Sequence, residues 1–208
     1  MKALILVDLQ NDFCPGGALP VPQGDQVIPI ANYLAARFEL VVATQDWHPP
    51  EHGSFAVNHP GRKPGECIEL AGLPQVLWPV HCVQGTPGAQ FHPALETAPI
   101  ARVFRKGLDP SVDSYSAFFD NARRRATGLD EFLKSQGVGE VYVAGLATDY
   151  CVRFTALDAV DLGYKTALVA DACRGVNLAP GDVDQAIEQL RAKGVRLVRS
   201  TDLPESIP

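Results

Sequence analysis

The chain has 208 residues and carries 24 acidic against 18 basic side chains, a formal net charge of −6 with histidine counted as neutral. Its hydrophobic content of 46% excludes an intrinsically disordered chain, and its 5 cysteines are too few for a scaffold held by disulfides. The acidic balance argues against a nucleic-acid surface, which needs clustered lysine and arginine. We therefore expect one folded domain over residues 1–208 that binds no nucleic acid.

The chain begins with a short apolar run, Ala3–Val7, which is followed directly by Asp8. This run is too short for the core of a signal peptide and far too short for a membrane span. The cysteines are odd in number, widely spaced and without a CxxC pair, unlike the cysteines of a secreted disulfide framework. We therefore expect a cytoplasmic protein that does not associate with membranes.

Short apolar runs alternate with helical stretches along the chain. The runs are continuous, which is typical of strands covered on both faces. The predicted strands are Ala3–Val7, Leu40–Ala43, Ala101–Phe104, Val141–Ala144, Thr166–Ala170 and Val195–Val198. The predicted helices are Gln26–Phe38, Leu129–Gln136, Cys151–Leu162 and Val183–Lys193. Strands that alternate with helices predict a parallel sheet in a three-layer α/β fold.

One segment, about residues 45–99, interrupts this alternation. It contains nine prolines, all five histidines and both tryptophans. A long segment without clear periodicity is usually either functional or disordered, and the aromatic content argues against disorder. We therefore expect an irregular wall that binds metal or substrate, with no domain boundary.

Three reactive side chains lie where predicted strands end: Asp8, Lys106 and Cys151. Ligands of parallel α/β sheets bind at the carboxyl ends of the strands, so we expect these residues to converge. A single aspartate can equally cap a helix, and a single lysine can equally be a solvated charge. Cys151 is more specific, because we expect it in the first turn of a helix, where the dipole lowers the pKa of a thiol.

A second group of polar residues lies in the irregular segment. Asp46 and His48 stand two apart after a predicted strand, and His81 follows later. One carboxylate and two imidazoles are ligands typical of a catalytic metal site with open positions. Alternatively, histidines in loops often only bond to the backbone.

Five long motifs follow one another along residues 7–159: VDLQNDFCPGG, ATQDWHPPEHGSF, WPVHCVQGTPGAQFHP, FRKGLDPSVDSYSAFFDN and VAGLATDYCVRFTALDA. Together they closely resemble the nicotinamidase/pyrazinamidase family of the isochorismatase-like cysteine hydrolase superfamily. The resemblance covers nearly the whole chain. It implies a three-layer α/β/α fold with a six-stranded parallel sheet.

For catalysis, the resemblance implies a triad of Asp8, Lys106 and Cys151. The backbone N–H groups of Ala147 and Cys151 would form the oxyanion hole. The family also has a non-proline cis peptide before the nucleophile, which here would join Leu146 to Ala147.

For the metal, the resemblance implies one divalent ion, Zn²⁺ or Fe²⁺ with Mn²⁺ as a further candidate, on Asp46, His48 and His81. His52 matches a position that ligates the ion directly in some members and through water in others. For the substrate, the family's pocket positions match Phe13, Trp78, Tyr115, Leu146 and Ala147.

The implied reaction is the hydrolysis of nicotinamide to nicotinate and ammonia through a Cys151 thioester, in NAD salvage, with pyrazinamide as a second substrate. One alternative is a related cysteine amidohydrolase that acts on another small amide, although such relatives generally lack this metal set. Another is a binding or sensor protein without turnover, which has no need of all three triad residues. The sequence leaves the oligomeric state open, with a homodimer as one candidate, and assigns no role to Cys67.

Overall fold

The apolar runs of the central strands are covered on both sides of the sheet, whereas the two edge strands are partly exposed. The computed structural model describes residues 1–208, and its first strand, β1 (Lys2–Val7), contributes to two separate hydrophobic cores. Leu4 and Leu6 belong to one core. Ile5 and Val7, which point the opposite way, belong to the other. A strand covered in this way needs apolar residues at every position, which explains the continuous pattern.

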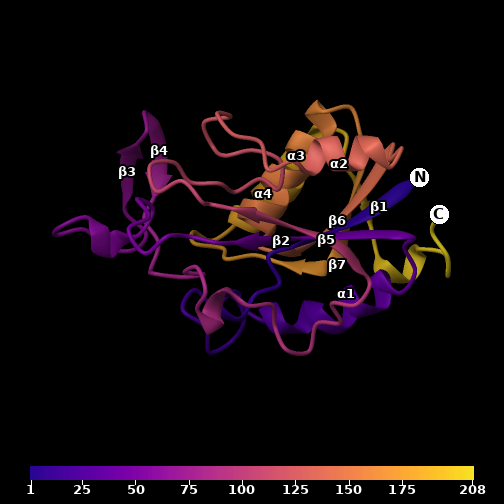
Figure 1. Ribbon diagram of the computed structural model, residues 1–208, viewed down its shortest axis with the longest axis horizontal. Coiled ribbons are helices and arrows are strands. Elements are labelled where there is room, and N and C mark those ends of the chain that lie inside the picture. Colours follow the sequence, from indigo (N-terminus) through magenta and orange to yellow (C-terminus); the bar gives the residue numbers. More distant parts are fainter.

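The strands form a six-stranded parallel sheet in the order β5-β2-β1-β6-β7-β8 (Figure 1). The other five strands are β2 (Leu40–Asp46), β5 (Ile100–Lys106), β6 (Glu140–Leu146), β7 (Lys165–Arg174) and β8 (Arg196–Val198). Each contains or overlaps one of the six predicted runs. The predicted six-stranded parallel sheet is therefore confirmed.

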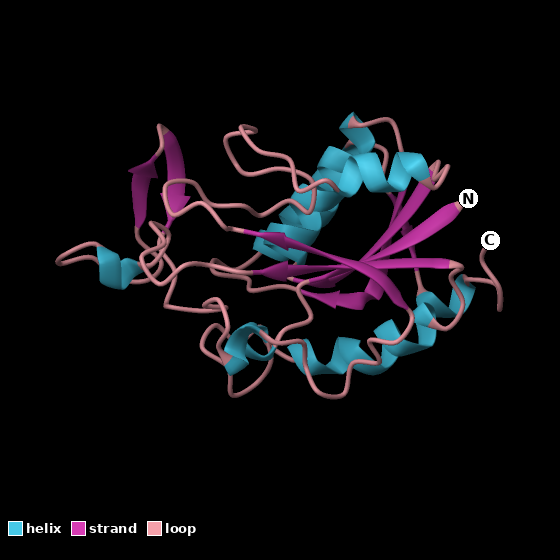
Figure 2. Cartoon of the chain, in the orientation of Figure 1, coloured by secondary structure: helices cyan, strands magenta, loops and turns pink.

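Helices cover both faces of the sheet, as Figure 2 shows, and the predicted three-layer α/β/α fold is confirmed. Helix α1 (Val27–Ala35) packs on one face, whereas α2 (Leu129–Ser135), α3 (Arg153–Asp161) and α4 (Asp182–Ala192) lie on the other (Figure 1). Helix α3 begins later than predicted because residues Thr148–Val152 form a π-helical turn before it. None of the helices has the length and apolar character needed to cross a bilayer.

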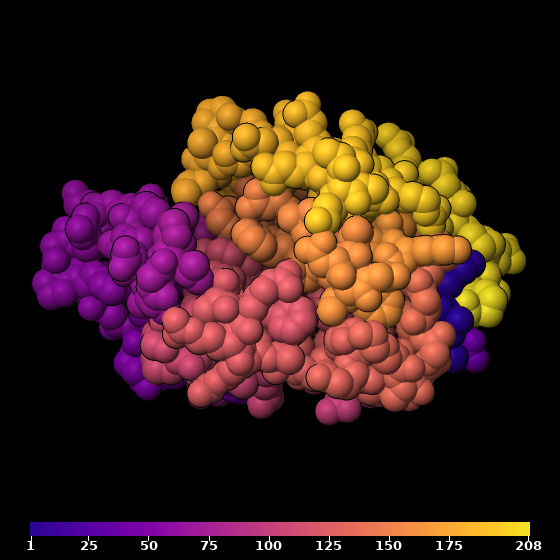
Figure 3. Space-filling view, turned by 90° about the horizontal axis from the view of Figure 1, so that it is seen from above, coloured from indigo at the N-terminus to yellow at the C-terminus, as the bar shows by residue number.

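The segment of residues 45–99 contains a hairpin that the sequence analysis missed. Strands β3 (Cys67–Leu70) and β4 (Leu73–Val76) pair antiparallel. They are joined by Ala71 and Gly72, both with positive φ, as two-residue hairpin turns require. The hairpin lies at the end of the molecule opposite both termini (Figure 1), and Figure 3 shows its segment as a projection from the body.

The strand order explains where a site can form. The chain leaves the central strand β1 toward β2 on one side, and β6 pairs with β1 on the other side. Such a change of direction opens a crevice at the carboxyl ends of the two central strands. In this chain those ends are Val7 and Leu146.

The close approach of β1 and β6 leaves no space for a side chain at Gly145. This residue has a φ of 125°, and a Cβ atom there would lie 2.1 Å from the backbone oxygen of Val7. We expect Gly145→Ala to reduce the free energy of unfolding by about 3 kcal/mol or more, because backbone strain and a clash with backbone combine. Thermal and urea unfolding followed by circular dichroism measure this loss.

Gly139→Ala is the matched control for this substitution. Gly139 precedes the same strand, has no positive φ, and a Cβ there would meet no atom within 4 Å. An equal loss of stability in both variants would contradict the steric explanation.

Candidate active site

Three side chains from separate strand ends meet at the crevice. Asp8 follows β1, Lys106 is the last residue of β5, and Cys151 lies in the π-helical turn after β6. The Lys106 Nζ lies 2.8 Å from the Asp8 Oδ2 and 3.3 Å from the Cys151 Sγ. The structure therefore brings together the acid, the lysine and the thiol that the sequence analysis singled out.

The Lys106 ammonium is buried and surrounded by acceptors. Besides Asp8 and Cys151, it donates to the Ser114 carbonyl at 3.1 Å and pairs with the Asp46 carboxylate. Burial alone would lower the pKa of Lys106, but the nearby Asp46 and Asp8 carboxylates raise it well above its usual value. The side chain is therefore a fixed positive charge.

The Asp8 carboxylate has an environment suited to proton transfer. Burial raises the pKa of Asp8 to about 6, although the Lys106 ammonium acts in the opposite direction. Thr44 of the adjacent β2 donates from its Oγ1 to the Asp8 Oδ1 at 2.6 Å and fixes the carboxylate in place. A carboxylate with a pKa near neutrality can accept and return a proton at physiological pH.

The expected low pKa of the Cys151 thiol is wrong for the free protein. Burial raises the pKa of Cys151 well above its usual value, and the Lys106 ammonium offsets only part of this effect. The thiol is only 6% exposed, so loss of hydration outweighs the helix dipole. The resting thiol therefore keeps its proton.

The backbone before Cys151 has the form that the family resemblance implies. The peptide bond between Leu146 and Ala147 is cis. The Ala147 N–H has no acceptor among the turn and loop hydrogen bonds of the chain. It is therefore free to donate to a bound group.

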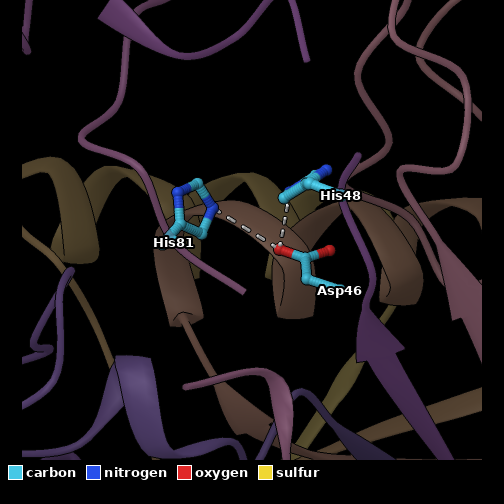
Figure 4. A group of neighbouring side chains, drawn as sticks. All are labelled: Asp46, His48 and His81. Carbon is cyan, nitrogen blue, oxygen red and sulfur yellow. Dashed lines mark ion pairs between the residues drawn. The ribbon is translucent and has the colours of Figure 1, made fainter. Parts of the chain in front are cut away.

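Beside Asp8 and Lys106 lies a cluster of potential metal ligands, shown in Figure 4. The Asp46 Oδ2 lies 3.5 Å from the His48 Nε2 and 3.8 Å from the His81 Nε2. Each histidine has its Nδ1 against a backbone carbonyl, that of Gly107 at 3.0 Å for His48 and that of Pro79 at 2.8 Å for His81. A carbonyl only accepts, so each Nδ1 carries a proton, and each ring turns its Nε2 toward Asp46.

The ligand types and the burial of this cluster suit a cation. One carboxylate and two imidazole lone pairs, all buried, match the donor set that divalent transition metals prefer. Burial lowers the pKa of His81 to about 4, which keeps this ring neutral as metal ligation requires. Burial acts in the same direction at His48, but the Asp46 carboxylate outweighs it and raises the pKa of that ring, so His48 releases a proton when a metal ion binds. The cluster therefore fits a divalent ion.

His52 is not part of this cluster. One of its ring nitrogens lies within 4.8 Å of a His48 nitrogen and an Asp113 oxygen. Its Nδ1 accepts the Ser54 N–H at 3.2 Å and lies 2.7 Å from the Ser54 hydroxyl. The buried Nε2 has no hydrogen-bond partner.

A cavity joins the thiol to the ligand cluster. Its wall consists of Phe13, Leu19, Asp46, His48, Trp78, His81, Asp113, Tyr115, Ala147, Tyr150, Cys151 and Val176. Four of the five residues predicted for the substrate pocket are among them. The exception is Leu146, which is fully buried in the hydrophobic core beneath the site because side chains alternate along β6.

The sequence analysis missed several residues that shape this cavity. Gln10 donates to the Asp46 carbonyl and accepts the Asp46 N–H, which fixes the backbone of a ligand. Asp149 accepts the N–H groups of Val176 and Asn177 and holds the loop from which Val176 lines the cavity. Neither Gln10 nor Asp149 has a sequence signal of its own, apart from lying beside Asp8 and Cys151.

The remaining cysteines lie apart from the cavity wall. Cys14, Cys82 and Cys173 are buried, whereas Cys67 is exposed on β3. All five cysteines are free thiols. Cys67 has no contact that suggests a role, and its exposure makes it a convenient control position.

Gly107 controls the position of the His48 ring. A Cβ atom on this residue would lie 2.3 Å from the His48 Cε1, and Gly107 has a φ of 68°. We expect Gly107→Ala to displace the ring and weaken binding of Zn²⁺ or Mn²⁺ by about tenfold or more. Isothermal titration of metal-free protein measures the change.

Gly61→Ala separates backbone strain from the ring contact. Gly61 has a similar φ of 79°, but a Cβ there would meet nothing within 4 Å. Its metal affinity should match that of the unsubstituted protein. Equal affinities in all three proteins would remove His48 from the ligand set.

Comparison with known proteins gives a consistent result. The isochorismatase domain family matches residues 2–202. A nicotinamidase of Escherichia coli is 54% identical over 209 residues, covering 99% of this chain and 98% of the relative. The solved structure of an Acinetobacter nicotinamidase/pyrazinamidase superposes with a TM-score of 0.95 at 50% identity, covering 98% of each chain. The pyrazinamidase of Pyrococcus horikoshii in complex with zinc superposes at 0.79, with 40% identity over 95% of this chain and 98% of that one.

Proposed function

This chain belongs to the isochorismatase family, and we propose that it acts as a nicotinamidase, which hydrolyses nicotinamide to nicotinate and ammonia. The observation that carries the proposal is the Lys106 ammonium, 2.8 Å from the Asp8 carboxylate and 3.3 Å from the Cys151 thiol, beside a buried metal-ligand cluster. The product nicotinate enters NAD salvage. Pyrazinamide is a second substrate, since it is also a carboxamide on an aromatic nitrogen ring.

The first chemical step forms a bond between Cys151 and the substrate. Asp8 takes the thiol proton, and Lys106 stabilises the thiolate as it forms. The sulfur attacks the carboxamide carbon, and the N–H groups of Ala147 and Cys151 hold the resulting oxyanion. Asp8 returns the proton to the leaving nitrogen, the C–N bond breaks, and ammonia departs from a nicotinoyl thioester.

The second step restores the enzyme. Asp8 now accepts a proton from water, whose oxygen attacks the thioester carbon. The C–S bond breaks, the sulfur recovers a proton, and nicotinate leaves. One carboxylate thus serves as base and acid in turn, which its pKa of about 6 supports.

The substrate ring would lie between the aromatic wall and the ligand cluster. Phe13, Trp78 and Tyr115 flank the cavity and can contact the ring faces and edges. Asp46, His48 and His81 would hold a divalent ion, which would supply a Lewis-acidic position for the ring nitrogen. The zinc-bound relative supports Zn²⁺, and the same donors also accommodate Fe²⁺ and Mn²⁺.

We further propose that the protein works in the cytoplasm, where a reducing environment keeps Cys151 a free thiol. A homodimer is the oligomer to be tested. Light scattering on the purified protein distinguishes a mass of 22.4 kDa from twice that value.

Replacement of the nucleophile tests the reaction. We expect Cys151→Ala to lower kcat for nicotinamide by about 10⁴-fold or more, since no other group near the carboxamide can form the thioester. Nicotinate is measured by chromatography and ammonia by a coupled assay, with a panel of other small amides in parallel. Cys67→Ala, a change of the exposed thiol, should retain full activity.

The proposed function is wrong if the unsubstituted, metal-loaded protein releases no nicotinate. Turnover of another amide in the panel would instead identify a related amidohydrolase. Retention of activity by Cys151→Ala would remove the thiol from the mechanism.

The raised pKa of Asp8 predicts the pH at which kcat/KM for nicotinamide falls on the acid side. The base must be ionised to take a proton, so kcat/KM should fall about tenfold for each pH unit below about 6. The Thr44 hydroxyl donates to the charged carboxylate and thereby favours it. Thr44→Val should therefore shift this fall to higher pH, and an unchanged pH dependence would contradict the assignment of Asp8 as the base.

A further inference from the structure

The cavity holds more buried negative than positive charge. Three buried carboxylates, those of Asp8, Asp46 and Asp113, lie around Lys106 and the ligand histidines, and Lys106 is the only ammonium in this group. When the ligand histidines are neutral, as metal ligation requires, the group carries two more negative charges than positive ones. Buried charge of this kind is costly unless a cation compensates it.

Asp113 is the carboxylate that the reaction leaves without a role. Asp113 is only 3% exposed, and it lines the cavity together with Asp46 and His48. Its Oδ2 accepts from the Gln75 amide and its Oδ1 from the Ser114 N–H, both at 2.8 Å. Both donors are neutral, and no ion pair of the chain includes Asp113. The charge is therefore held in place but not neutralised.

His52 supplies a matching donor next to this acceptor. Its Nδ1 accepts the Ser54 N–H, so the proton of the neutral ring resides on Nε2. That Nε2 is buried and makes no hydrogen bond of normal geometry, although the Val112 backbone lies close to the ring. In contrast to His48 and His81, His52 thus presents a donor rather than a lone pair. Such a ring suits a contact with the water around an ion rather than with the ion itself.

We propose that Asp113 belongs to an outer layer of the metal site and balances the charge of the divalent ion from there, on the side of His48 where the family resemblance already places His52 next to the ion. A doubly charged cation cancels the excess of two negative charges. The donor and the acceptor face the same small space, since the nitrogens of His48 and His52 and the oxygen of Asp113 lie within 4.8 Å of one another. This inference rests on the metal role of Asp46, His48 and His81 in the proposed function.

The hairpin contributes to this layer through Gln75 of β4. The Gln75 side chain is buried, and its Nε2 contacts the Asp113 Oδ2 and, at 3.1 Å, the Tyr115 hydroxyl. The Trp78 Nε1 donates to the same hydroxyl at 3.3 Å. The projecting hairpin therefore positions both the outer carboxylate and the aromatic wall, and Gln75 is a positioning residue.

The test is the metal affinity of Asp113→Asn, which keeps the size of the side chain but removes its charge. Metal-free protein is titrated with Zn²⁺ against a chromophoric chelator and with Mn²⁺ by calorimetry. We expect both dissociation constants to rise about 10- to 100-fold, as for other residues around metal ligands. Asp120→Asn, which changes a buried carboxylate of the same loop outside this cavity, should bind both ions like the unsubstituted protein.

Thermal unfolding distinguishes this role from a structural one. Metal-free Asp113→Asn should melt no lower than the unsubstituted protein, because it loses an uncompensated buried charge, and saturating metal should raise its Tm by less. A lower Tm without metal, together with an unchanged metal affinity, would indicate a structural role and overturn the proposal.

Gln75→Leu provides a second, independent variant should Asp113→Asn fail to fold. It leaves the charge but removes its side-chain donor, so metal binding should weaken by less than in Asp113→Asn. If the unsubstituted protein binds neither ion, the proposed metal role itself is wrong. If it binds both ions and the dissociation constants of both variants match its own within about twofold, only the outer layer is wrong.

Discussion

The site depends on one buried ammonium. Lys106 lies among the Asp8 carboxylate, the Asp46 carboxylate, the Cys151 sulfur and the Ser114 carbonyl. A buried charge of this kind is tolerated only if several partners face it at once. Its partners come from the ends of β1, β2 and β6 and from the loop after β5, so the parallel sheet must bring these ends to one edge.

Asp46 links the two halves of the site. Its Oδ1 pairs with Lys106, while its Oδ2 faces the Nε2 atoms of His48 and His81. The group beside the thiol and the ligand cluster therefore share one carboxylate. Gln10 binds both the N–H and the carbonyl of Asp46 and so fixes the residue that the two halves share.

Much of the architecture could be predicted because its causes are local. Six continuous apolar runs mark the strands, and all six are present in the sheet, although only the inner strands are covered on both faces. The hairpin β3–β4 was missed because Pro74 and the polar residues around it obscure its alternation. The helix dipole suggested a low thiol pKa, but only the structure shows how completely Cys151 is buried. Leu146 was misplaced because the motif alone does not show which face of β6 it occupies.

The sequence by itself determined the strands, the order of the motifs and the residues Asp8, Lys106, Cys151, Asp46, His48 and His81, because these follow from apolar patterning and from recognisable motifs. Only the tertiary structure decided which atoms of these residues face one another. It also placed Asp113, His52 and Gln75 around the ligand cluster. Protonation, tautomer and charge balance depend on distance and burial between segments far apart in the chain, and no local pattern encodes them.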